Sequence, residues 1–185
     1  MEKAKTNNQK MEMKAKGTNP MQVVRLEKVT LNCGAGSDAK KLDRSIKLLT
    51  MLGEGTVKNT LSRSRIPAFG IRINQEIGCM ITLRGEKAMA LLKRLLEGAQ
   101  NKLKKKQISN GYFGFGIKEY IEIPGVTYSR EIGVLGLDIC VTLEKAGRRV
   151  ALRKIKQGRM GNNQKISQEE TIKFLEENFS KLKIE

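Results

Sequence analysis

The sequence contains no histidine and no tryptophan, and only three of its 185 residues are cysteine. These cysteines, Cys33, Cys79 and Cys140, lie far apart and form no CxxC pair. Protein zinc sites are built mainly from cysteine and histidine, and a disulfide framework needs cysteines in pairs. We therefore expect no metal site, no cofactor and no disulfide. Cys79 and Cys140 stand in apolar alternation, so we expect both to be buried.

Long hydrophobic runs are also absent, and no stretch approaches the length that crosses a membrane. The first twenty residues hold five lysines but no apolar segment, which argues against a secretory signal, and their two glutamates argue against a mitochondrial transit peptide. Together with the unpaired cysteines, this pattern favours a cytoplasmic, reducing compartment and no membrane partner.

The residues needed for catalysis are missing as well. The acidic residues do not form a pair suited to acid–base chemistry, and Asp38, Asp43 and Asp138 are better explained as helix caps and solvated side chains. No serine has a nearby base. We therefore expect no catalytic residue and predict that the protein is not an enzyme.

What the sequence has in excess is positive charge. Lysine and arginine number 36 against 19 aspartates and glutamates, a formal net charge of +17. Two stretches contain no acid: one holds Lys58, Arg63, Arg65 and Arg72, and the other holds Arg148, Arg149, Arg153, Lys154, Lys156, Arg159 and Lys165. A solvated protein surface usually mixes charge signs, and clustered cations release counterions from a polyanion, so we predict a nucleic-acid partner.

The hydrophobic pattern predicts a mixture of helices and strands. Helices are expected over 38–52, over 86–103 with Lys102, Lys104, Lys105 and Lys106 at its C-terminus, and over 168–182 behind a Ser167–Glu170 capping box. Alternation predicts strands over 77–83 and 137–143. We expect an α+β domain over residues 20–182, with an antiparallel sheet and helices on one face, after a flexible basic tail at 1–19.

Residues 26–38 predict a strand, a glycine turn and the start of a helix capped by Ser37 or Asp38. Gly34 and Gly36 could expose backbone N–H groups beside Asn32, so a nucleotide-dependent enzyme is one alternative. It is weak, because Ala39 replaces the third glycine of a dinucleotide fingerprint and Asp38 would repel a pyrophosphate. A second alternative is a basic RNA-binding protein that does not discriminate between RNAs.

The segment NGYFGFG, residues 110–116, is dense in glycine and aromatic residues. It resembles an RNA-recognition-motif core sequence, but its register fails because Phe113 directly follows Tyr112. Phe113 or Phe115 could stack on RNA bases, and packing of both rings in the core is the favoured interpretation.

Four blocks follow one another in the order and spacing of a known family: VVRLEKVTLNCGAG, FGIRINQEIGCMITLRGEKA, GYFGFGIKEYIEIPGVTY and EIGVLGLDICVTLEKAGRRVA. The chain thus resembles large-subunit ribosomal protein five, the 5S-rRNA-binding family, over about residues 19–179. IPGVTY and KISQEETIKFLEENF resemble its archaeal and eukaryotic branch. The resemblance implies a two-layer α+β fold in which a curved antiparallel sheet binds RNA on one face and carries helices on the other.

The resemblance also implies partners. These are 5S rRNA, large-subunit rRNA in the central protuberance, P-site tRNA, and neighbouring ribosomal proteins including one of the small-subunit head. Asn32 and Thr82 match residues that contact 5S rRNA, and we assign Gly34, Gly36 and Arg84 to the same site. Lys58, Arg63, Arg65 and Arg72 are assigned to a tRNA-facing loop, and the second basic stretch to other rRNA contacts. The expected location is the cytoplasmic ribosome, with nucleolar assembly if the organism is eukaryotic.

The chain departs from the family at three places. Gly53, Glu54 and Gly55 stand where a family glutamine contacts 5S rRNA, Gln22 replaces an arginine, and Gln164-Lys165 replaces His-Arg before the last helix. We expect a somewhat altered RNA surface on an unchanged fold.

Overall fold

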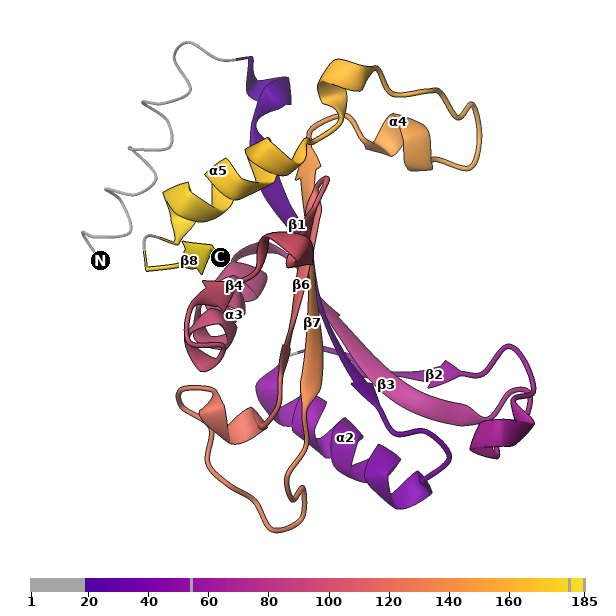
Figure 1. Cartoon of the computed structure of the whole chain (residues 1–185). Helices are drawn as coiled ribbons and strands as arrows, with labels where there is room; N and C mark the ends of the chain where they lie inside the picture. The colour runs from indigo at the N-terminus through magenta and orange to yellow at the C-terminus, as the bar shows by residue number, and fades with distance from the viewer. Residues whose placement is uncertain (1–18, 54, 180, 185) are drawn as a thin grey trace.

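A six-stranded antiparallel sheet forms the centre of the computed structural model (Figure 1), which describes residues 19–53, 55–179 and 181–184. Its strand order is β2-β3-β1-β7-β6-β5. The bounds are β1 Val24–Gly34, β2 Lys58–Leu61, β3 Glu76–Leu83, β5 Ile108–Ser109, β6 Tyr112–Ile117 and β7 Leu137–Lys145. The expected α+β fold with an antiparallel sheet is confirmed. Residues 1–18 of the predicted tail, and Glu54, lie outside the described residues.

Three longer helices lie on one side of this sheet: α2 Ala39–Leu52, α3 Gly85–Gly98 and α5 Gln168–Asn178 (Figure 1). Alternate residues of the strands supply the core beneath them, including Leu31, Ile81 and Ile139, which are all at most 1% exposed. Among the described residues, no helix is both long enough and apolar enough to span a membrane.

Asp38 caps α2, as predicted: its carboxylate accepts hydrogen bonds from the backbone N–H groups of Lys40 and Lys41, at 3.0 and 3.4 Å. The helix ends at Leu52, where it was predicted to end, and Gly53 is its C-cap. The carboxylate satisfies N–H groups that have no partner within the helix.

The helix expected over 86–103 was predicted too long. It ends at Gly98, because Gln100 and Asn101 take left-handed backbone angles (φ 58° and 54°) that reverse the chain. A short strand, β4 Lys102–Leu103, follows and pairs in parallel with β8 Lys183–Ile184. The four lysines from Lys102 to Lys106 therefore do not lie at a helix C-terminus, where the helix dipole would favour their charge, and that prediction is wrong.

Helix α5 begins with the predicted capping box: the Ser167 hydroxyl accepts from Glu170 N–H, and Glu170 accepts from Ser167 N–H. It ends at Asn178 rather than at 182, because the chain turns at Phe179 and continues toward its pairing with β4. Thr171, Phe174 and Leu175 are its buried residues.

The aromatic rings of Phe113 and Phe115 are 1% and 6% exposed, which confirms that they pack in the core. Cys79 is buried as predicted, but Cys140 is exposed, so the prediction for it is wrong. The reason is its position in β7, where Ile139 and Val141 point into the core and Cys140 between them points to the opposite face.

Two projections extend from the sheet beyond the helix layer (Figure 1). One is the hairpin between β2 and β3, whose tip carries the short 3-10 turn Pro67–Phe69. The other is the basic extension, residues 148–165, with the short helix α4 Arg149–Leu152 and the 3-10 turn Asn162–Gln164. Figure 1 shows both projections on the side away from α2 and α3, so they flank the sheet face that the helices leave uncovered.

Candidate nucleic-acid interface

The uncovered face of the sheet is set by alternation along β1. Val29, Leu31 and Cys33 are buried, so Thr30 and Asn32 between them point to the opposite face. We call this surface, formed by the outward residues of β3, β1, β7 and β6, the open face. Its centre holds the uncharged side chains of Thr30, Asn32, Thr82 and Cys140 together with the carboxylate of Asp138, and none of these is basic.

Strand register brings the two principal predicted residues onto the open face together. Thr30 pairs with Thr82 of β3 on one side and with Cys140 of β7 on the other. Asn32, two residues further along, pairs with Met80 and Asp138. Asn32 and Thr82 are therefore diagonal neighbours on one surface, where a single partner can reach the amide and the hydroxyl.

The β6 side of the open face carries almost no side chains. Tyr112, Gly114 and Gly116 are its outward residues, and Tyr112 is 57% exposed. A Cβ at Gly116 would lie 3.2 Å from the Asp138 Oδ1 atom, which is tight. On β6 the residue available for base stacking is therefore Tyr112, which was not predicted from the sequence. It could have been, because alternation along Tyr112-Phe113-Gly114-Phe115 turns Tyr112 outward when Phe113 and Phe115 point into the core.

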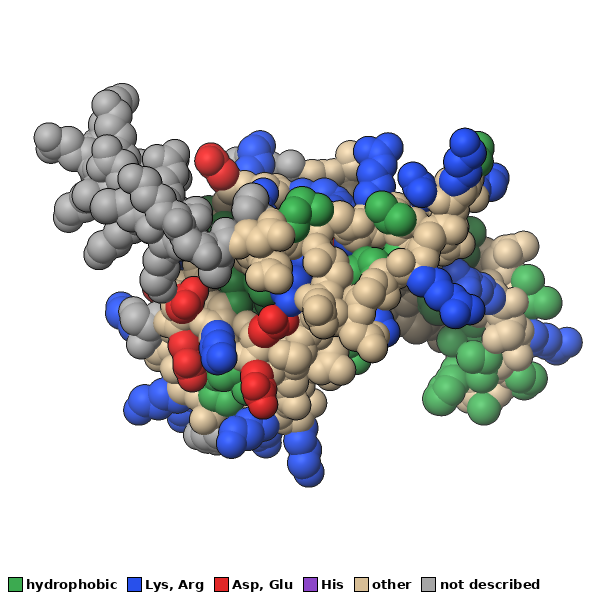
Figure 2. All heavy atoms as spheres, turned by 90° about the horizontal axis from the view of Figure 1, so that it is seen from above, with side chains coloured by type: hydrophobic (Ala, Val, Ile, Leu, Met, Phe, Trp, Pro, Cys, Tyr) green, Lys and Arg blue, Asp and Glu red, His purple; other side chains and the backbone are tan. Residues whose placement is uncertain are grey.

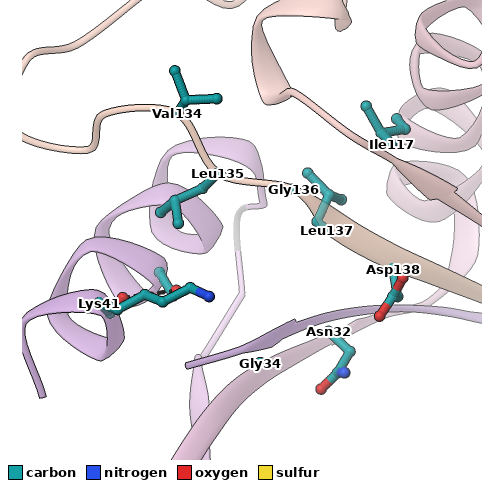
Figure 3. A pocket seen from close by; sticks show the side chains of 10 residues that line it. Asn32, Gly34, Lys41, Ile117, Val134, Leu135, Gly136, Leu137 and Asp138 are labelled. Carbon is teal, nitrogen blue, oxygen red and sulfur yellow. Dashed lines mark hydrogen bonds between the residues drawn. The ribbon is translucent and has the colours of Figure 1, made fainter. Parts of the chain in front are cut away.

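Asn32 also borders a pocket of about 410 Å³ at the edge of the sheet (Figure 3). Figure 3 shows Asn32 and Asp138 pointing to the same side of their paired strands, with Lys41 reaching in from α2. On that side the Asn32 amide and the Asp138 carboxylate offer donors and acceptors suited to the polar edge of a base or a ribose hydroxyl, whereas Lys41 lies on the α2 side of β1. Asp138 and Lys41 were not predicted, because only the register and the helix docking place them here.

The turn after β1 does not suit a nucleotide. Ala35 N–H and Gly36 N–H both donate to Ile77 O, at 2.9 and 3.0 Å, so neither is available to a phosphate. The Asp38 carboxylate already occupies the start of α2. The sheet is antiparallel, whereas a dinucleotide fold needs a parallel one. These findings contradict the nucleotide-dependent enzyme that was one alternative from the sequence.

Arg84 lies just beyond β3, at the position before α3, and its guanidinium is paired with Glu27 at 3.1 Å. Arg148, the first residue of the basic extension, lies 3.9 Å from the same carboxylate. Nearby Glu144 of β7 has a raised pKa, because burial and the negative charge of Glu27 both disfavour its ionised form. The structure thus joins two arginines that the sequence assigned to different contacts.

The residues assigned to the tRNA-facing loop fall in two places. Arg63, Arg65 and Arg72 belong to the projecting hairpin, which is closed by a pair of backbone hydrogen bonds between Ile66 and Ile71, at 3.0 and 3.1 Å. Lys58 lies on β2 instead and pairs with Met80, beside the open face. The tip also exposes Phe69, at 70%.

The basic extension is fixed at its base by two side chains. Lys145, whose side chain is 3% exposed, donates to Asn163 O, Lys165 O and both carboxylate oxygens of Glu170, the last two at 2.8 Å. Gln164 Nε2 donates to Met21 O and Ala146 O, at 2.8 and 2.6 Å. One of the departures from the family, Gln164, therefore joins the basic extension to the backbone at Met21 and Ala146.

Most cations of the extension remain at the surface: Arg149, Arg153, Lys154, Lys156 and Arg159 are exposed. Arg153 Nε donates to Lys156 O at 2.6 Å, and Lys165 Nζ donates to Asn162 Oδ1 at 3.1 Å, so these two cations also brace the loop. Figure 2 shows basic side chains around most of the visible outline, the lower left included, while the visible acidic side chains lie among them in the left half. The right half shows lysines and arginines without visible acids, which favours a polyanionic partner there.

No other chemistry competes with this interpretation in the described ranges. No group of histidine, cysteine, aspartate or glutamate side chains there could hold a metal ion. Burial raises the pKa of the Cys33 thiol to about 12, with smaller effects of Cys79 and Asp138, and burial raises that of Cys79 to about 11. Neither thiol is therefore activated as a nucleophile.

Comparison with known proteins agrees with these features. The family model described as "Ribosomal protein L5" matches residues 19–72, and the model of the C-terminus of the same ribosomal protein family matches residues 76–174. "Large ribosomal subunit protein uL5" of Archaeoglobus fulgidus is 42% identical over 90% of this chain and 93% of its own length. The proteins of that name from Methanobrevibacter smithii and Tetrahymena thermophila are 43% and 39% identical, over 88% and 90% of this chain and 96% and 97% of their own lengths.

The sheet has helices on one face and an open polar face on the other. Together with these matches, this identifies the class of the chain: it is a structural protein of the large ribosomal subunit. Within that class, the chain belongs to the ribosomal protein L5 family. The resemblance drawn from the four sequence blocks is confirmed, and so is the branch, because the relatives are archaeal and eukaryotic.

Proposed function

We propose that this protein positions 5S rRNA in the large ribosomal subunit by binding it across the open face. The observation that carries this proposal is the placement of Asn32 and Thr82 as diagonal neighbours on the sheet face that none of the described helices covers. Uncharged donors and acceptors on a flat surface fit unpaired bases and 2′-hydroxyl groups of a structured RNA. The surrounding lysines and arginines supply affinity that depends on salt.

The two projections would contact other parts of the ribosome. The basic extension would bind large-subunit rRNA in the central protuberance, and the hairpin tip with Arg63, Arg65 and Arg72 would lie near P-site tRNA. A bridge to a small-subunit head protein, and residence in the cytoplasmic ribosome after nucleolar assembly in a eukaryote, belong to the same proposal. It is supported by family membership and by the exposure of both projections beside the open face.

Asn32→Ala and Thr82→Ala should each weaken 5S rRNA binding by about 1–2 kcal/mol, the effect of losing a hydrogen bond to a group that becomes buried in the complex. The measurement is a gel-shift titration at physiological salt with a large excess of bulk tRNA. Thr50→Ala is the matched control, because Thr50 is exposed on α2 in the helix layer and its hydroxyl bonds only to Ile46 O. Equal affinity of the wild type and both variants would remove these residues from the site.

The same titration separates the specific proposal from its remaining alternative. Tight binding that survives the tRNA excess supports recognition of 5S rRNA. Complete competition by tRNA would favour a basic protein that reads only phosphate charge.

Neutralising the hairpin tip, by Arg63→Gln with Arg65→Gln, should leave 5S rRNA affinity within about twofold, because the tip projects away from the centre of the open face. Ribosomes that carry this variant should translate more slowly than wild type in an in vitro assay. Lys105→Gln with Lys106→Gln removes the same charge from an exposed site outside both projections and the open face and is the control. A large loss of 5S affinity would instead place the hairpin on 5S rRNA.

A further inference from the structure

A β-bulge in β1 brings Glu27 out of the core. Val29, Leu31 and Cys33 point inward, so strict alternation would send Glu27 inward too. The register with β7 shifts between Leu26, opposite Leu143, and Lys28, opposite Thr142, so Glu27 is the extra residue. A bulge re-aims the side chain that it carries, and here it delivers a carboxylate to the surface instead of an apolar interior.

That carboxylate meets two arginines from distant parts of the sequence. Glu27 Oε1 lies 3.1 Å from Arg84 Nη1, and Glu27 Oε2 lies 3.9 Å from Arg148 Nη1. The Glu27 side chain is only 15% exposed, whereas Arg84 is 59% and Arg148 is 37% exposed. The acid is therefore anchored beneath two guanidinium groups that still face solvent, at the junction of the open face and the basic extension.

We propose that Glu27 is a positioning residue that sets RNA selectivity by holding Arg84 and Arg148 and partly neutralising them. This inference rests on the proposed binding of 5S rRNA. A paired guanidinium binds a passing phosphate weakly, because the phosphate must compete with the carboxylate. Some RNAs have a shape that presents a phosphate to each of the two guanidinium groups. Such an RNA binds more tightly because the guanidinium groups are already oriented, and this gain offsets part of the competition from the carboxylate.

The test is Glu27→Gln, which keeps the side-chain size and removes the charge. Glu144 of β7 remains beside the two arginines, but without the Glu27 charge they should bind any RNA better. Affinity for bulk tRNA should therefore rise about three- to tenfold, and its salt dependence should steepen by about one phosphate contact. Affinity for 5S rRNA should stay unchanged or fall, so the ratio of 5S to tRNA affinity should drop at least about threefold. Glu176→Gln on α5, an exposed acid in the helix layer, makes the same change in net charge and should leave the ratio unaltered.

A double-mutant cycle tests whether Glu27 acts through the arginines. In an Arg84→Gln, Arg148→Gln background, Glu27→Gln should no longer change the ratio. The inference about Glu27 is overturned if the wild type prefers 5S rRNA but Glu27→Gln leaves the ratio unchanged, or changes it equally in both backgrounds. The proposed function would still stand in that case. A wild-type protein without preference would overturn both.

Discussion

Glu170→Ala should lower the free energy of unfolding by about 3 kcal/mol, because it leaves the buried ammonium of Lys145 without its carboxylate. The value lies at the low end for a buried ion pair, since Glu170 is 39% exposed and two backbone carbonyls still accept from Lys145. Lys145→Met removes the buried charge itself and fills most of its volume, so it should cost less, about 1–2 kcal/mol. Chemical denaturation of both variants measures the difference.

The double variant is the decisive comparison for this pair. Once Lys145 is methionine, Glu170→Ala should cost only about 1 kcal/mol, because what remains to be lost is its capping hydrogen bond from Ser167 N–H. If Glu170→Ala lowered the free energy of unfolding by the same small amount in the wild-type background, the burial of Lys145 would not depend on the Glu170 carboxylate.

The same pair predicts how stability depends on pH. Burial acts to raise the pKa of Glu170, but hydrogen bonds from Lys145 and from Ser167 N–H, together with the Lys145 charge, hold it below its ordinary value. The stabilisation is therefore present above the ordinary glutamate pKa and is lost as the pH falls through the lowered one. Urea titrations between neutral and acidic pH should show this loss in the wild type and a smaller one in Glu170→Ala.

Neutralising the basic extension should have the largest effect on RNA binding. The triple variant Arg149→Gln, Lys154→Gln, Arg159→Gln should lower affinity for large-subunit rRNA on the order of 100-fold at low salt, if each cation contributes about 1 kcal/mol. The slope of log affinity against log salt should become shallower by about three, one for each lost phosphate contact. Filter binding across a salt series measures both quantities.

A matched triple variant in the helix layer controls for net charge. Lys93, Lys105 and Lys106 are exposed and lie outside the extension, and changing them to glutamine removes the same three charges. We expect this control to change the slope little. If both triple variants lost the same affinity and the same salt slope, the total charge of the protein would attract RNA, and the basic extension would not be a specific RNA-binding site.

Much of the architecture could be predicted because local rules agreed with the fold. Asp38 and the Ser167–Glu170 box mark the starts of α2 and α5, and each satisfies helix N–H groups with a side chain next to them in sequence. Alternation along β1 and β3 places Asn32 and Thr82 on outward positions from the sequence alone.

The predictions that were wrong or missing concern features that depend on tertiary geometry, or on which alternate residues of a strand point into the core. α3 ends at Gly98 because Gln100 and Asn101 take left-handed backbone angles, whereas the apolar pattern continues to Leu103 and predicts a longer helix. Cys140 belongs to an alternating strand, and its phase relative to Ile139 was misread. The pairing of Asn32 with Asp138, and the meeting of Glu27 with Arg84, follow from strand register and a bulge that the sequence does not reveal.

Whether RNA covers the open face can be tested with a residue that the protein already has. Cys140 is exposed on that face and pairs with Thr30, next to Asn32, whereas Cys33 and Cys79 are buried with raised pKa values. The measurement is the rate at which a thiol reagent modifies Cys140 in the intact chain, with and without saturating 5S rRNA and with bulk tRNA present. We predict strong protection by 5S rRNA. An unchanged rate, in a sample where 5S rRNA is demonstrably bound, would place the RNA elsewhere and contradict the account.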